Sequence, residues 1–347
     1  MGAADLDPVA WTMRRYEGAP LRMTFSAGSR ADALLWQDRL RGKLVELIGG
    51  LPQERVGLDV RRLEVREYPT YVREKITFVS RAGVSVLGYV LTPRKVTRPV
   101  ATVVCVPGHG RGVDDIVGIR VDGEDCSGGE GYQRDFALQA VERGLAVVAI
   151  EPMGFGHRRD PVTRERGLQA ACQPVAGAAL LLGETMIGWR VWDVMRAVDY
   201  IETCPDLDAR RVGCVGISGG GTCALFTAAL DRRIRCAYVS GYLSTFRASI
   251  MSLSHCIDNY VPGILNWAEM YDVAGLIAPR PLFSEAGEHD PIFPVAASRE
   301  SFRRVKHIYA VMGAEEHAQQ EVFDGGHRFH GERGWPFIVS ALNGPAR

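Results

Sequence analysis

The feature that most constrains the fold is a serine flanked by glycines, placed between two different kinds of segment. Residues 211–215 form an apolar run, and residues 222–230 have the composition of a helix. Between them lies Gly216-Ile-Ser218-Gly219-Gly220. Glycine suits such a turn because a Cβ would collide with the backbone that packs against it. The pattern predicts a sharp strand–turn–helix unit that lifts the Ser218 hydroxyl above the edge of a sheet.

The rest of the chain extends this alternation of strands and helices. Two β-like segments, 72–78 and 84–91, predict a hairpin, and later apolar segments predict strands at 101–106, 146–151, 212–217, 236–240, 282–286 and 319–323. Helical patterns fall between them, at 133–143, 187–202, 222–230 and 296–312. Apolar strands that alternate with helices predict an α/β fold: a mostly parallel, doubly wound sheet with helices on both faces.

The first 70 residues have a different pattern. Residues 30–48 place apolar side chains at helical spacing, and Gly49, Gly50 and Pro52 end the pattern. We therefore expect an N-terminal helical extension over residues 1–70 and a catalytic domain over residues 71–347. Packing or oligomerisation is the expected role of the extension, and a homo-oligomer is left open.

Composition excludes several classes of function. Lysine plus arginine equals aspartate plus glutamate, and no basic tract occurs, so nucleic-acid binding has no electrostatic support. No apolar stretch has the length of a membrane span, and the N-terminus lacks the pattern of a signal peptide. Several of the eight cysteines lie in apolar runs and resemble small buried hydrophobic residues rather than a disulfide framework, which favours a reduced, cytoplasmic protein. We predict no metal, because no pair of cysteines has CxxC spacing, and no cofactor, because the Gly154-Phe-Gly156 pattern lacks the third glycine of a dinucleotide site.

One acidic and one basic side chain complete a candidate catalytic set with Ser218. A serine hydroxyl needs a base within hydrogen-bond reach, and the base needs an orienting acid. Asp290 follows the predicted strand 282–286, and His327 follows the strand 319–323, so both lie at the carboxyl edge of the sheet. We assign Asp290 as the acid and His327 as the base. Glu288 and His289 are rival candidates, and His330 could form an HxxH pair with His327, although a structural role suits it better.

The oxyanion of the reaction requires backbone N–H donors. Gly219 follows the nucleophile and supplies one of them. The second is expected from the glycine-rich loop at residues 106–112, for which we assign Arg111, with Gly110 as the alternative.

The substrate pocket is expected to involve long connections at the same edge of the sheet. Residues 245–278 lie between two late strands and resemble a functional loop or cap. We name His255, Tyr260 and Trp267 from this connection, and His109 from the oxyanion loop, as candidate substrate-binding residues.

These motifs together resemble a known superfamily. Residues 107–112, 188–202, 216–221, 278–294 and 324–327 are similar to the corresponding stretches of the α/β-hydrolase superfamily, over positions 71 to 337. Within it, the chain resembles the esterases related to dienelactone hydrolase and acetyl xylan esterase. The resemblance implies hydrolysis of carboxylic esters, often short-chain acyl or acetyl esters. Dienelactone hydrolases use a cysteine nucleophile, so Ser218 favours an ordinary esterase.

The sequence therefore predicts a metal-independent serine esterase that acts on a small-molecule ester through Ser218, Asp290 and His327. Two alternatives remain. An oligopeptidase-like amide hydrolase would share the elbow and the triad, and a non-catalytic scaffold would share the fold alone.

Overall fold

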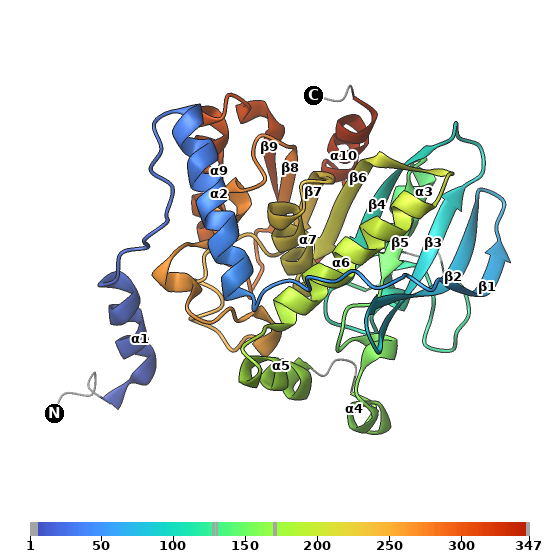
Figure 1. The fold of residues 1–347 in the computed structure, drawn as a ribbon, viewed down its shortest axis with the longest axis horizontal. Helices are drawn as coiled ribbons and strands as arrows, with labels where there is room; N and C mark the ends of the chain where they lie inside the picture. The colour runs from blue at the N-terminus through green and yellow to red at the C-terminus, as the bar shows by residue number, and fades with distance from the viewer. Residues whose placement is uncertain (1–5, 127–128, 130, 169–171, 345–347) are drawn as a thin grey trace.

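One mixed sheet organises the molecule. The computed structural model describes residues 6–126, 129, 131–168 and 172–344. Within them the sheet has nine strands in the order β1-β2-β3-β5-β4-β6-β7-β8-β9 (Figure 1). The strands are β1 (Arg61–Glu67), β2 (Tyr71–Arg81), β3 (Val84–Pro93), β4 (Val100–Val106), β5 (Ala146–Ile150), β6 (Leu207–Ile217), β7 (Ile234–Ser240), β8 (Leu282–Gly287) and β9 (Ala318–Phe323).

The sheet is antiparallel at one side and parallel over the rest. β2 pairs antiparallel with both β1 and β3, and β3 pairs antiparallel with β5. From β5 onward every neighbouring pair is parallel. The carboxyl ends of β4 to β9 therefore meet at one edge, which is where sheets of this kind bind ligands.

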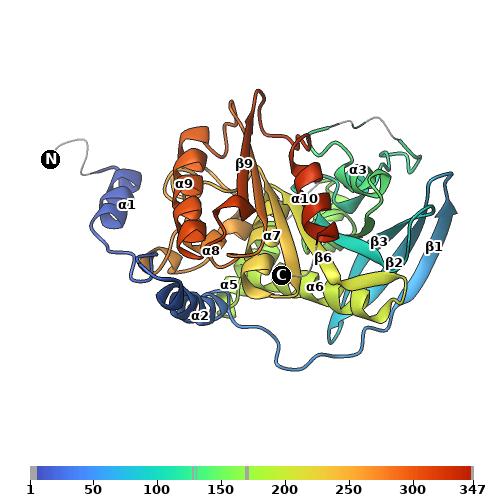
Figure 2. The same ribbon diagram turned by 90° about the horizontal axis from the view of Figure 1, so that it is seen from above.

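Helices cover both faces of the sheet. Alternate residues of β4 enter two separate apolar cores, with Val104 in one and Val103 and Cys105 in the other. The first core is closed by α6 (Met186–Thr203), α7 (Gly219–Leu230) and α9 (Val295–Val311), and the second by α3 (Phe136–Glu142) and α10 (Gly334–Asn343) (Figure 2). The predicted doubly wound α/β fold is confirmed.

The N-terminal 70 residues are joined closely to this body. Helix α2 (Arg30–Leu47), capped by Ser29, buries Ala33, Leu40 and Leu44 in the first core. Helix α1 (Pro8–Glu17) has no buried residue and stands apart from the sheet (Figure 1). Strand β1, in a region expected to be helical, pairs with β2, with Glu67 opposite Val72. The boundary predicted after residue 70 thus falls inside a hairpin.

Three short helices lie in the connections: α4 (Pro161–Glu165), α5 (Cys172–Leu181) and α8 (Met270–Gly275). In the described part of the chain, every helix is too short or too polar to cross a membrane.

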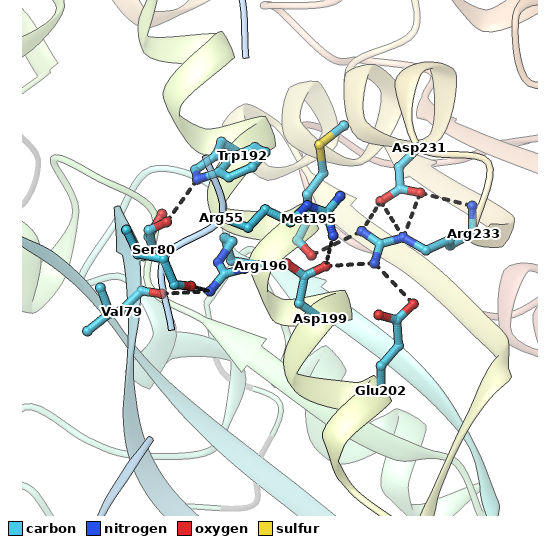
Figure 3. Close-up of polar contacts among 11 residues, drawn as sticks. Arg55, Val79, Ser80, Trp192, Met195, Arg196, Asp199, Glu202, Asp231 and Arg233 are labelled. Carbon is cyan, nitrogen blue, oxygen red and sulfur yellow. Dashed lines mark hydrogen bonds and ion pairs between the residues drawn. The ribbon is translucent and has the colours of Figure 1, made fainter. Parts of the chain in front are cut away.

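A network of ion pairs around the buried carboxylate of Asp199 joins α6 to its surroundings. Asp199 accepts hydrogen bonds from Arg55 (2.7 Å), Arg196 (2.6 Å) and Arg233 (2.6 Å) (Figure 3). Arg55 comes from the linker that precedes β1, and Arg233 lies next to β7. One carboxylate therefore joins the linker, α6 and the start of β7.

Candidate active site

The candidate nucleophile sits on a strained turn between β6 and α7. Ser218 has φ 56° and ψ −122°, a backbone conformation that residues other than glycine rarely adopt. A Cβ on Gly216 would lie 2.2 Å from the Gly220 carbonyl oxygen, and a Cβ on Gly220 would lie 1.9 Å from the Val106 carbonyl oxygen. Only glycine fits at these two positions, so the predicted elbow geometry is present.

The candidate base and acid come from the ends of β9 and β8. His327 Nδ1 lies 2.7 Å from Asp290 Oδ2. The other carboxylate oxygen of Asp290 accepts the backbone N–H groups of Ile292 (2.8 Å) and Phe293 (3.1 Å). Gly241, at φ 50°, makes room for the pair, because a Cβ there would lie 3.1 Å from His327 Cε1. The carboxylate is thus held in place and orients the imidazole.

Ser218 and His327 face one cavity of about 460 Å³. His327 Nε2 is buried and has no hydrogen-bond partner among the described residues, so the serine hydroxyl and Nε2 share the cavity without a bond between them. Such bonds often tighten only when substrate binds. Leu253, Pro291, Ile292 and Phe293 form the apolar wall of the cavity.

The two predicted oxyanion donors differ in their surroundings. Gly219 is the first residue of α7, so helix geometry leaves its N–H without an intrahelical partner. The Arg111 N–H donates to Asp115 Oδ2 at 2.8 Å, and the Arg111 guanidinium also pairs with Asp115. Asp115 therefore occupies the amide that the oxyanion would need, and the assignment of Arg111 is wrong. His109, earlier in the same loop, lines the cavity beside Ser218.

The predicted pocket residues divide into two groups. His109 and His255 line the cavity. Tyr260 is 40% exposed, and its hydroxyl donates to the Ile250 carbonyl at 3.1 Å, outside the cavity lining.

Trp267 also lies away from the cavity. Its carbonyl accepts the Met23 N–H at 2.7 Å, and the cations of Arg22 and Lys43 lie over its ring. The N-terminal segment covers this tryptophan, so the assignments of Tyr260 and Trp267 to the pocket are corrected.

Several cavity residues were missed from the sequence. Tyr132 donates its hydroxyl to the His109 carbonyl at 2.5 Å, and its ring stacks on His327 at 5.7 Å. Phe293 packs against His327 from another side at 5.7 Å. Phe293 lies close to Asp290 in sequence and could have been found from that position, whereas no local pattern marks Tyr132.

The rival candidates lie outside the cavity lining. His289 is 69% exposed at its side chain and pairs with Asp324 at 3.1 Å. Glu288 lies 3.7 Å from Arg299. His330 directs Nε2 toward Glu321, at 3.7 Å, rather than toward the cavity.

A charged cluster adjoins the cavity. His109, Cys172, Cys256 and Asp258 bring possible ligand atoms within 4.8 Å of one another. Arg190 already donates to Asp258 Oδ2 at 2.5 Å and to Cys172 Sγ at 3.4 Å. A metal cation would face this guanidinium, so the group has the character of a buried ion-pair network. In a second group of described residues, the possible ligand atoms of Glu321, His330 and Glu332 also lie within 4.8 Å of one another.

Electrostatics in this cluster favour the ionised forms. Burial opposes the charge on Asp258, but Arg190 and His109 outweigh it and hold the pKa of this carboxyl well below its ordinary value. Burial would likewise lower the pKa of His109, but Asp258 outweighs it and raises that pKa to about 9. His109 is therefore an imidazolium at neutral pH.

The chain is similar to a known protein family and to a named hydrolase. Residues 19–332 match the model described as the Abhydrolase family. The protein named "Putative hydrolase YtaP" from Bacillus subtilis is 28% identical over 283 residues, covering 80% of this chain and 89% of the relative.

Two solved structures share the fold. A "putative acetyl xylan esterase" from Bacteroides fragilis superposes with a TM-score of 0.78 at 19% identity, over 92% of this chain and 82% of that one. A glucuronoyl esterase from Solibacter usitatus gives a TM-score of 0.67 at 16% identity, over 89% and 93% of the two chains.

Proposed function

The chain belongs to the Abhydrolase family and has the α/β-hydrolase fold, and on this basis we propose that it is a serine esterase for short-chain acyl or acetyl esters. The observation that carries the proposal is the convergence of Ser218, on a glycine elbow, with the His327–Asp290 pair at one cavity. A relative named as a hydrolase, and structures named as esterases, are consistent with an ester substrate.

The first step forms an acyl-enzyme. Ser218 Oγ attacks the ester carbonyl carbon while His327 Nε2 takes the hydroxyl proton, and Asp290 stabilises the imidazolium through Nδ1. The backbone N–H groups of Gly219 and His109 bind the oxyanion. His109 takes the place that was assigned to Arg111 from the sequence.

The second half of the reaction returns the enzyme to its starting state. The imidazolium of His327 gives its proton to the leaving alcohol as the carbon–oxygen bond of the ester breaks. His327 then removes a proton from water, which attacks the acyl carbon and releases the acid from Ser218. The apolar wall formed by Leu253, Ile292 and Phe293 suits a small acyl or alcohol group.

Substitution of the nucleophile tests this proposal. Ser218→Ala should lower kcat for p-nitrophenyl acetate by at least about 10³-fold, because the remaining oxyanion donors cannot replace the nucleophile. A fluorophosphonate probe should label Ser218, and circular dichroism should show an unchanged fold. Ser252→Ala is the matched control, since Ser252 is an exposed serine outside the cavity lining.

Two results would contradict the proposal. Retained ester turnover in Ser218→Ala would exclude this serine as the nucleophile. Turnover of acyl-peptide anilides without ester turnover would favour the amide hydrolase, and absence of labelling on folded protein would favour the non-catalytic scaffold.

A further inference from the structure

The side chain of His109 lies against Gly219 at the cavity that holds Ser218. A Cβ built on Gly219 would lie 3.2 Å from both Cε1 and Nδ1 of His109. Gly219 is the residue whose N–H we propose as an oxyanion donor, and both His109 and Ser218 line the cavity. The Nδ1 edge of the ring therefore lies against Gly219, the residue that follows the candidate nucleophile.

The opposite edge of the ring is fixed by a buried carboxylate. His109 Nε2 lies 3.2 Å from Asp258 Oδ2, and Asp258 is 2% exposed. Arg190 donates to the same oxygen at 2.5 Å and anchors itself on the Met153 carbonyl at 2.6 Å. With Nε2–H directed at Asp258, the charged ring presents its second N–H from Nδ1.

Aromatic packing sets the orientation of the ring. Phe155 lies 4.6 Å from the His109 ring and 4.3 Å below the Arg190 guanidinium. The buried phenyl ring thus packs against both cations. His109 lines the cavity, and Arg190 lies outside its lining. This packing holds the plane of the His109 ring, and the contact of Nε2 with Asp258 sets which nitrogen faces Gly219.

The charged groups around His109 come from several elements. Asp258 faces it from the 245–278 connection, and Cys172, at 3.6 Å, faces it from the start of α5. Arg190 on α6 lies beyond Asp258. His255 and His327 share the cavity, and burial, together with the positive field of His109, lowers the pKa of His255. Asp258 is the nearest anion and opposes these cations.

We propose that His109 is a further catalytic residue, whose Nδ1–H binds the oxyanion together with the backbone donors. This inference rests on the proposed esterase function. As the Ser218 Oγ–carbon bond forms, the carbonyl π pair moves to oxygen and the serine proton goes to His327. His109 keeps its proton and supplies charge, and hydrogen bonds from charged donors are about twice as strong as neutral ones.

The variant His109→Gln tests the proposal. It removes the charge, so we expect kcat to fall about 10²-fold with a smaller change in KM. The wild-type acylation rate should also decline above about pH 9, as His109 loses its proton, and this alkaline decline should be absent from His109→Gln. In Asp258→Asn the decline should move to lower pH, because the stabilising anion is gone.

The matched control is His157→Gln. His157 Nε2 lies 3.2 Å from Asp114 Oδ2, the same separation as in the His109 pair, but His157 lies outside the cavity lining. Its kcat and pH profile should equal those of the wild type. Titration of active sites with the fluorophosphonate corrects every rate for the folded fraction, which removes a merely structural effect.

A His109→Gln enzyme with wild-type kcat and an unchanged alkaline decline per labelled site would overturn this inference. Ser218→Ala would still be inactive in that case, and the esterase proposal would stand. Failure of the esterase proposal itself would instead appear as retained turnover in Ser218→Ala.

Discussion

At the scale of single residues, the site depends on positions where a side chain has no room. The elbow needs glycine at 216 and 220 because the strand that carries the nucleophile passes within contact of the following helix and of the end of β4. Such positions were predictable, since the glycine pattern is local in the sequence. Ser218 bears the strain of φ 56°, which the surrounding packing must outweigh.

Gly220→Ala should therefore both destabilise and inactivate the protein. The new Cβ would lie 1.9 Å from the Val106 carbonyl oxygen, a backbone atom that cannot move without shifting β4. We expect a loss of about 3 kcal/mol in the free energy of unfolding and a fall in kcat, measured by urea denaturation and ester hydrolysis. Gly177→Ala, in α5 with no atom within 4 Å of the new Cβ, should be neutral or stabilising. Equal stability of the two variants would contradict this account.

Residues whose role depends on tertiary contacts could not be predicted in the same way. The Arg111 amide was assigned from its place in a glycine-rich loop, but the fold of that loop brings Asp115 onto it. Trp267 was assigned from its place in a long connection, but α2 and the segment before it cover that ring. Asp290 and His327 meet at 2.7 Å because each lies just past the carboxyl end of a parallel strand, and that rule can be read from the sequence.

At the scale of elements, the strands were easier to predict than their connections. Apolar residues identified β2 to β9, because strands such as β4 and β5 are buried on both faces and the outer strands β2 and β9 are buried on one. Strand β1 was missed because all seven of its residues are exposed and most are charged, and its strand conformation comes from pairing with β2. Helix α10 was also missed, although Trp335, Ile338 and Leu342 bury one of its faces.

The end of β5 illustrates how an element holds a loop of the active site. Glu151 follows β5, is fully buried, and accepts the N–H groups of Val113 (3.0 Å) and His157 (3.2 Å). A Cβ on Gly112 would lie 2.0 Å from its carboxylate. Glu151 thus fixes the end of the loop that carries His109.

This carboxyl predicts a specific dependence of stability on pH. Burial raises the pKa of Glu151 from 4.5 to about 7. Its protonated form suits the folded state, so this contribution to stability is complete below about pH 4.5 and is lost as pH rises to about 7. Relative to Glu151→Gln, the wild type should lose about 3 kcal/mol over this range, measured by urea unfolding. Glu142→Gln, an exposed change on α3, should show no such trend, and a parallel trend in Glu151→Gln would refute the assignment.

The network on α6 gives a second prediction for an element (Figure 3). Asp199→Ala would leave the guanidinium groups of Arg55, Arg196 and Arg233 without their shared carboxylate. We expect a loss of about 3–5 kcal/mol in the free energy of unfolding, because Arg196, 4% exposed, would lose its carboxylate, whereas Arg233 keeps Asp231 and Arg55 is half exposed. Glu202→Ala removes an exposed member that bonds Arg233 at 3.1 Å, and should cost less than about 1 kcal/mol. Similar losses in the two variants would show that burial does not decide the effect.

At the scale of the whole molecule, the cavity depends on segments that are far apart in the sequence. His109, Ser218, His255 and His327 come from four different connections, and the sheet brings them to one edge. The 245–278 connection is in turn covered by the N-terminal segment, where Met23 bonds to Trp267 and Thr24 lies 3.3 Å from Asp272. The N-terminal residues therefore support the wall of the cavity as well as the core.

Truncation should separate the two parts of this N-terminal segment. Removal of residues 1–18 deletes α1, which has no buried residue, and should leave the melting temperature nearly unchanged. Removal of residues 1–50 also deletes α2, with Leu40, Leu44 and Ile48 each 1% exposed. Their burial contributes about 1.5–3 kcal/mol each, which together rivals the whole stability of a typical domain.

The longer truncation also removes polar contacts that α2 makes with the body of the protein. Gln37 donates to the carbonyls of Gly275 and Ala278, both at 2.8 Å, and Arg41 donates to that of Leu276 at 2.8 Å. We expect this variant to aggregate or to melt at least about 10 °C lower than the full chain in calorimetry. An unchanged melting temperature would mean that α2 is a dispensable appendage, because the core would then close without it.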